Sequence, residues 1–109
     1  MPTVYKVLGQ SAPTAATATT LYTVPASTST LISTLNVSNT GGAADYVRVA
    51  VRPAGAVLAN QHYIVYGVQV PSASILTLTI GITLATTDVV TVYSTTGTSS
   101  FNAFGSEIS

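Results

Sequence analysis

The residues that could carry out acid–base or nucleophilic chemistry are few and scattered. The 109 residues contain three basic residues, three acidic residues, one histidine and no cysteine. His62 would need a hydroxyl and a carboxylate nearby to form a nucleophilic triad, but the strained nucleophile turn G-x-S-x-G does not occur. We therefore predict that His62 lies in a strand or turn without a catalytic role, and that the protein is not an enzyme.

The acidic residues do not group into a pattern that would hold a metal ion. Asp45, Asp88 and Glu107 occur singly, and no D-x-D spacing typical of a calcium loop is present. Without cysteine, neither a disulfide nor a thiolate zinc site can form. Asp88 follows two threonines and precedes an apolar segment, so we expect it to accept an Asx-type hydrogen bond from nearby backbone. The sequence therefore predicts no metal and no cofactor.

The composition also argues against two classes of partner. Three basic residues are too few to neutralise a useful number of phosphates, so we expect no nucleic-acid binding. No segment approaches the roughly 18 consecutive apolar residues of a membrane span, and the N-terminal residues lack the charged and apolar regions of a signal peptide. We expect synthesis in the cytoplasm and no membrane contact.

Charged residues make up 6% of the chain, whereas about 25% is typical of soluble domains. The polar surface must come instead from 19 threonines and 12 serines. The formal net charge is zero and the mean hydropathy is +0.51. A neutral, weakly charged surface tends to associate. This composition favours a subunit of an assembly, with self-association expected.

The elements expected to position these residues are short strands. Turn-forming residues recur at short intervals, and no segment shows a helical apolar period. The sequence predicts a single antiparallel β-sandwich, Ig-like or jelly-roll-like with Greek-key connections, of about 7–9 strands. The clearest strands are residues 45–52, 75–80 and 89–94, with alternating aliphatic and polar side chains. Weaker segments are residues 3–8, 21–24, 31–38, 61–70 with a possible break at Gly67, and 100–108.

The chain is expected to form one domain in two parts. Residues 1–20 are predicted to form an N-terminal strand and an extended arm or loop, and residues 21–109 the β-sandwich core. The glycines of Asn39-Thr40-Gly41-Gly42 allow positive φ, which indicates a hairpin or a turn that crosses between sheets. Within residues 75–80, Leu76, Leu78 and Ile80 are expected to face the core.

Five residues are candidates for a subunit interface. Arg48 and Arg52 lie four apart on one predicted strand face, about 13 Å from each other, with Tyr46 on the same face. Arg and Tyr are common interface anchors, although two arginines could also simply keep an outer face hydrated. Phe101 and Phe104 are the only phenylalanines, and the segment that carries them could fill the core or dock on a neighbour.

A platform for sugar binding would need exposed planar aromatic side chains. The chain has six tyrosines and no tryptophan. Tyr63 and Tyr66 are three residues apart, so on one regular strand they are predicted to point to opposite faces. This spacing argues against a shared aromatic platform at these two residues.

Several segments resemble small virion structural proteins of tailed bacteriophages. They are Leu21-Tyr22-Thr23-Val24-Pro25, residues 32–39, Gly81-Ile82-Thr83-Leu84 followed by residues 87–93, and Phe104-Gly105-Ser106-Glu107-Ile108. The resemblance covers most of the chain from Leu21 onward, and its motifs are mainly strand and turn patterns. It implies a β-sandwich used for assembly, without catalytic residues.

Such modules serve as capsid decoration (cement) proteins and as parts of tails, baseplates or fibres, and the motifs do not choose among these positions. The start at Met1 and the size of one domain lead us to expect a separate small protein. We expect a capsid decoration protein on the virion surface, with the major capsid protein or other virion proteins as partners. The alternative is a structural module of the tail, baseplate or fibre, or a module that binds host-surface glycans.

Overall fold

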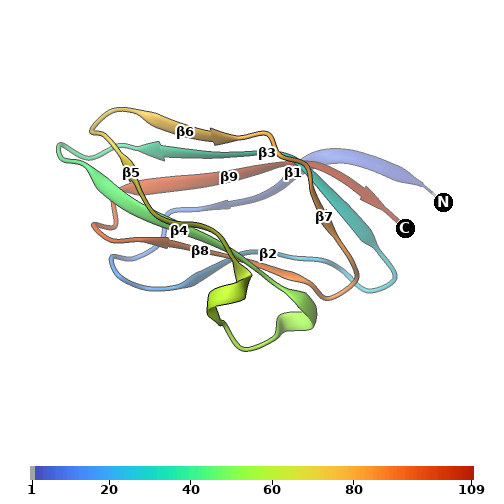
Figure 1. Ribbon diagram of the computed structural model, residues 1–109. Coiled ribbons are helices and arrows are strands. Elements are labelled where there is room, and N and C mark those ends of the chain that lie inside the picture. Colours follow the sequence, from blue (N-terminus) through green and yellow to red (C-terminus); the bar gives the residue numbers. More distant parts are fainter. Residues whose placement is uncertain (1) are drawn as a thin grey trace.

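The computed structural model describes residues 2–109, which fold into two antiparallel β-sheets packed face to face (Figure 1). The prediction of an antiparallel β-sandwich is confirmed. In chain order the elements are β1 (Thr3–Ser11), β2 (Thr19–Thr23), β3 (Ser29–Asn39), β4 (Asp45–Arg52), η1 (Pro53–Gly55), η2 (Asn60–His62), β5 (Tyr63–Val70), β6 (Ile75–Leu78), β7 (Ile82–Leu84), β8 (Val89–Ser94) and β9 (Ser99–Ile108).

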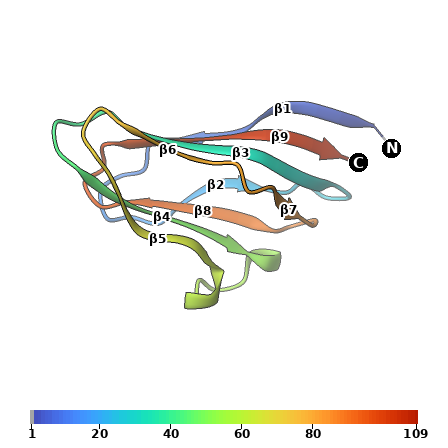
Figure 2. The same ribbon diagram turned by 45° about the horizontal axis from the view of Figure 1, so that its top comes forward.

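The strand order identifies the sandwich as a jelly roll. Sheet A has the order β1-β9-β3-β6, with β7 pairing farther along β3, and sheet B has the order β2-β8-β4-β5. If β6 and β7 are taken as one interrupted edge strand, eight strands remain, arranged as the two Greek keys of a jelly roll. The topology therefore decides between the Ig-like and jelly-roll alternatives. Figure 2 shows the two sheets as separate layers, with β1, β9 and β3 in one and β2, β8 and β4 in the other.

Aliphatic side chains fill the space between the sheets. Val47 and Val49 of β4 and Val90 and Val92 of β8 are fully buried, as their alternation predicted. Each such side chain stabilises the fold by about 1.5–3 kcal/mol relative to an exposed position. The other members of the core cluster are Leu8, Leu21, Tyr22, Val24, Ile32, Leu35, Val37, Val65, Val70, Leu84, Phe101 and Ala103.

The weaker predicted strands differ from the observed ones only by a few residues at their ends, but β7 was not predicted, and two regions differ more. The strand expected over residues 75–80 ends at Leu78, and Ile80 is 63% exposed rather than in the core. The backbone turns at Gly81, whose φ is 68°, and the chain then forms the separate strand β7. At Gly67, where a break was considered, β5 continues through a β-bulge with a φ of 71°.

The two ends of the sandwich carry different features. The turn that begins at Asn39 crosses from sheet A to sheet B, which is one of the two expected alternatives, but Gly41 and Gly42 do not adopt positive φ. The Asn39 side chain is buried and donates to the carbonyls of Ala43 and Val70 at 2.8 and 2.9 Å. Both ends of the chain lie at the opposite end of the sandwich, where Thr3 of β1 and Ser29 of β3 pair with Ile108 of β9 (Figure 1).

The predicted N-terminal segment is part of the sandwich rather than separate from it. Residues 3–11 form β1, which pairs with β9, and residues 12–18 connect β1 to β2 in the other sheet. The two strands approach closely at Gly9, where an added Cβ would lie 2.3 Å from the carbonyl oxygen of Leu21. Within residues 2–109, no helix has the length and apolar character needed to cross a membrane.

Candidate functional site

Asp45 lies at the start of β4 with its carboxylate fully buried. One carboxylate oxygen accepts hydrogen bonds from the backbone N–H groups of Tyr46 and Thr96, at 2.8 and 3.0 Å. The other oxygen accepts from the hydroxyls of Ser94 and Ser99. Burial is the largest influence on the pKa of Asp45 and acts to raise it, but the four hydrogen bonds together outweigh burial and hold the pKa below its ordinary value. Asp45 thus fastens the β8–β9 turn to β4.

Arg52 and Asp88 hold the loop that follows β4. The Arg52 guanidinium donates to the carbonyls of Ala56 and Gly55, at 2.7 and 3.1 Å, and to the hydroxyl of Thr91 at 3.3 Å. Asp88 accepts from the N–H of Ala54 at 2.9 Å. It also accepts from the N–H of Ala85 at 2.9 Å, so the predicted bond to nearby backbone is present, but its donor lies three residues earlier and not two residues later as in an Asx turn. Both charges therefore act on nearby loop backbone.

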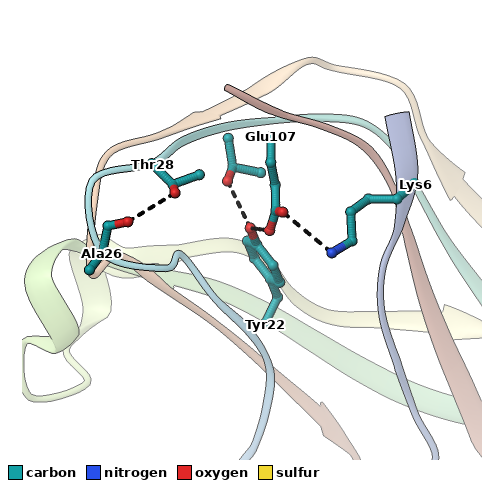
Figure 3. A network of polar contacts seen from close by, with 6 residues as sticks. Lys6, Tyr22, Ala26, Thr28 and Glu107 are labelled. Atoms are coloured by element: carbon teal, nitrogen blue, oxygen red, sulfur yellow. Dashed lines mark hydrogen bonds and ion pairs between the residues drawn. The ribbon is translucent and has the colours of Figure 1, made fainter. Parts of the chain in front are cut away.

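Glu107 joins the two sheets near the termini, in the network drawn in Figure 3. Its carboxylate accepts hydrogen bonds from the hydroxyl of Tyr22 in β2 and, at 3.3 Å, from the ammonium of Lys6 in β1. The Tyr22 hydrogen bond is the main cause that lowers the pKa of Glu107. The pKa of Tyr22 is raised to about 12, mainly by burial and secondly by the hydrogen bond to Glu107. The Tyr22 hydroxyl also lies 2.8 Å from the hydroxyl of Thr30.

His62 has a structural role at η2. It is 9% exposed, and its Nδ1 accepts a hydrogen bond from the N–H of Ala59 at 3.1 Å. Among residues 2–109, no three histidine, aspartate or glutamate side chains come close enough together to hold a metal ion. The three acidic side chains and His62 therefore bond to backbone or to nearby side chains, and they do not converge on one site.

The outer face of sheet B carries four of the six tyrosines, together with Arg48. The tyrosines are Tyr46, Tyr63, Tyr66 and Tyr93, and we call these five residues the tyrosine face. The Arg48 guanidinium stacks on two of the rings, 4.2 Å from the centroid of Tyr93 and 4.4 Å from that of Tyr66. Each such contact contributes about 0.5–1 kcal/mol at an exposed site. Arg48 thereby holds the two rings on either side of β4 in fixed positions.

The prediction that Tyr63 and Tyr66 point to opposite faces was wrong. Their rings meet edge to face, with centroids 4.8 Å apart. Ala50 pairs with Tyr63 and Val49 with Val65, so β5 has one unpaired residue between these pairs. This extra residue reverses the alternation of side chains and brings two tyrosines three positions apart onto one face.

An open depression of about 480 Å³ adjoins this pair, lined by Asn60, Tyr63 and Tyr66. Tyr66 is 61% exposed, so its ring is accessible from solvent. Asn60 contributes a carboxamide that can both donate and accept hydrogen bonds. Together, the exposed rings and the amide could bind a small polar molecule that has a flat apolar surface.

The outer face of sheet A carries an apolar patch made of Tyr5, Val7, Leu31 and Phe104. Val7 pairs directly with Phe104, while Tyr5 and Leu31 flank Ser106 of β9 from the two neighbouring strands. Paired residues and residues two apart share one face of a sheet, so the four side chains lie together. Their exposed fractions range from 38% for Phe104 to 84% for Tyr5.

The five residues predicted as an interface lie in different parts of the molecule. Tyr46 and Arg48 share the outer face of sheet B, but Arg52 is bonded to its own loop. Phe104 lies on the opposite sheet, and Phe101 is 0% exposed and fills the core. Phe101 therefore cannot contact a partner.

The sequence pattern does not distinguish Tyr5, Val7 or Leu31 as surface residues. Tyr5 and Val7 alternate with Val4 and Lys6, so both faces of this segment carry apolar residues and the pattern does not indicate which side is covered.

Comparisons with protein-family models, with curated proteins and with solved structures found no match to this chain. The two exposed sheet faces and the internal bonding of the charged side chains are therefore the features that indicate a function.

Proposed function

We propose that the protein is a non-enzymatic structural subunit that acts by binding other proteins of an assembly. The observation that carries this proposal is the apolar patch of Tyr5, Val7, Leu31 and Phe104 on the outer face of sheet A. A contiguous apolar group on an outer sheet face is a feature of protein–protein contacts.

The disposition of the charged side chains supports the same conclusion. Five of the six charged side chains form hydrogen bonds within the chain, and Arg48, the sixth, stacks between two tyrosines. Few charges remain to bind a charged ligand or to make a contact sensitive to salt. Binding through such a surface would depend mainly on apolar burial and shape.

The resemblance of several segments to small virion proteins of tailed phages supports a more specific proposal. The protein would be a capsid decoration protein, with the major capsid protein as its partner. Each contact through a patch of four side chains would be modest, and the many copies on a shell would multiply the effect. The alternative placement within this proposal is the tail, baseplate or fibre.

Counting the protein in purified particles would test the proposal. Quantitative mass spectrometry should find the chain in a fixed, high ratio to the major capsid protein, and particles without it should release their genome at a lower temperature. A few copies per particle would favour the tail placement. Absence from particles would refute a virion role altogether.

Rebinding to stripped particles would test the surface. Phe104→Ser and Leu31→Ser should reduce rebinding at least about tenfold, because each removes apolar area from the centre of the patch. Val57→Ser is the matched control, since Val57 is 88% exposed and lies in the loop outside the patch. Equal rebinding by all three variants would assign the contact to another face.

A second candidate function, binding of host-surface glycans, is favoured by the depression beside Tyr63 and Tyr66. Exposed aromatic rings can stack on the apolar face of a sugar, while Asn60 could hydrogen-bond its hydroxyls. A glycan array probed with the isolated protein should show binding that Tyr66→Ala abolishes and Phe104→Ser leaves intact. No binding across polysaccharides of the host surface would refute this candidate.

A further inference from the structure

The free edge of β1 differs from the other sheet edges. β2 has five residues and a register shift between Thr20 and Tyr22, and β5 has two such shifts. The opposite edge of sheet A is divided between β6 and β7, which are four and three residues long. Short and bulged edges resist pairing with another strand. Residues 3–7 of β1, in contrast, pair with β9 without a register shift, and no described strand pairs with their other side.

The direction of the backbone groups in this segment follows from one hydrogen bond. The N–H of Ser109 donates to the carbonyl of Pro2 at 3.1 Å, so the Pro2 carbonyl points toward β9. Because the hydrogen-bonding direction alternates along an antiparallel strand, Val4 and Lys6 also direct their groups toward β9. The residues whose N–H and C=O groups point to the free edge are Thr3, Tyr5 and Val7.

We propose that this edge pairs with the same edge of a second copy of the chain, in an antiparallel arrangement centred on Tyr5. β1 begins at Thr3, and the register shift after Val7 ends the regular segment on the other side. The segment that can pair is therefore symmetric about Tyr5. Tyr5 faces Tyr5 of the second copy and Thr3 faces Val7, and each of the three resulting pairs exchanges two hydrogen bonds.

The charges of the segment are compatible with this register. Lys6 is its only charged residue, and it lies opposite Val4 of the second copy rather than opposite another Lys6. A lysine on a free edge usually discourages pairing. Here its ammonium is bonded to Glu107 of β9, at 3.3 Å. The ammonium is thereby drawn away from the free edge.

Pairing would also join the apolar patches of the two copies. Thr3, Tyr5 and Val7 share the outer face of sheet A, so the two patches would meet across the two-fold axis. A contact of five residues per copy is below the roughly 1,000 Å² of a stable interface, so we expect weak association in solution. This inference rests on the geometry of the edge and not on the proposed function.

Amide hydrogen exchange, measured residue by residue by NMR, would test the register. As protein concentration increases, the amides of Thr3, Tyr5 and Val7 should become more protected. Those of Val4 and Lys6 should change little, because β9 already protects them. Tyr5→Pro should weaken self-association by about tenfold or more, because it removes one donor from each copy while leaving the pairing with β9 intact. Tyr5→Thr, which keeps the donor, is its control.

Disulfide formation between single-cysteine variants would test the symmetry, since the natural chain has no cysteine. In the proposed register, the two Tyr5 Cα atoms would lie about 5.5 Å apart, within the range that a disulfide can span. The two Val4 Cα atoms would lie about 8 Å apart, beyond that range. Tyr5→Cys should therefore form covalent dimers at least about tenfold faster than Val4→Cys. Val57→Cys, at an 88% exposed loop position, measures random collision.

Two results would overturn the proposal. The first is equal crosslinking rates for the three cysteine variants together with exchange that does not depend on concentration. The second is protection of Thr3, Tyr5 and Val7 only when another protein is added, which would assign the edge to that protein instead of a second copy.

Discussion

The buried Asp45 carboxylate should be the most sensitive polar group of the fold. In Asp45→Ala, the N–H groups of Tyr46 and Thr96 lose their acceptor. An unpaired buried donor costs about 1–3 kcal/mol, and these two part-buried donors should each cost an amount toward the lower end of that range. The hydroxyls of Ser94 and Ser99 lose theirs too, although a hydroxyl can rotate toward another acceptor. We therefore expect a loss of about 3–5 kcal/mol, a large part of the 5–15 kcal/mol typical of a domain.

Asp45→Asn is the matched control because it has nearly the same shape. Its carbonyl oxygen can accept from both backbone N–H groups, and its NH₂ can donate to the two serine hydroxyls. Only the charge-assisted part of the bonding is lost, so we expect a loss of about 1–2 kcal/mol. Urea unfolding, followed by circular dichroism and tyrosine fluorescence, measures both variants against the natural protein.

The pH dependence provides a second test of Asp45. Its pKa in the folded protein is below the ordinary value of 3.8, so its contribution to stability is present above about that pH. The contribution is lost as the pH falls through the folded pKa. The stability difference between the natural protein and Asp45→Asn should therefore shrink below about pH 4. Equal stability of both variants and the natural protein at pH 7 would refute the assigned role.

Three further substitutions test other parts of the fold. Tyr22→Phe should lower the stability of the fold by about 1–2 kcal/mol. It should also remove the loss of stability that ionisation of Tyr22 causes at alkaline pH. Because the pKa of Tyr22 is raised from 10.0 to about 12, its stabilisation is complete below pH 10 and lost toward pH 12, which thermal unfolding across that range would detect. Gly105→Ala should lower the free energy of unfolding, measured in urea, by more than about 2 kcal/mol, because the added Cβ would lie 2.0 Å from the carbonyl oxygen of Leu31. Gly42→Ala is the control: an added Cβ there has no other atom within 4 Å, so the free energy of unfolding should change by less than about 0.5 kcal/mol. Similar values for the two alanine variants would contradict the close approach of β9 to β3. Arg52→Ala should speed amide exchange at residues 54–56 while changing global stability by only about 1 kcal/mol. Unchanged exchange at these residues would show that the guanidinium does not hold the loop.

Much of the strand content could be predicted from local pattern. The strands at residues 45–52 and 89–94 have the bounds that were expected, because alternating β-branched residues fill one face and turn residues or proline end them. The sequence also predicted a turn after Asn39, either a hairpin or a crossing between sheets, and a bond from nearby backbone to Asp88. These features depend on neighbouring residues alone.

The candidate surfaces were harder to predict, since bulges determine them. The unpaired residue in β5 brings Tyr63 and Tyr66 together, and a register shift after Val7 ends the regular part of β1. A bulge adds one residue to one strand and has no characteristic side chain at these positions, so it becomes visible only when the partner strand is placed.

By itself, the sequence determined that the protein is a β-sandwich with few charges and no thiol chemistry, because composition and period-two alternation are local properties. Only the tertiary structure decided what those charges do. Asp45 is bonded to hydroxyls about 50 residues away, Glu107 to a tyrosine of the other sheet, and Phe101 is buried while Phe104 is exposed. These outcomes depend on which strands become neighbours, and long-range pairing brings together residues that no window of the sequence contains.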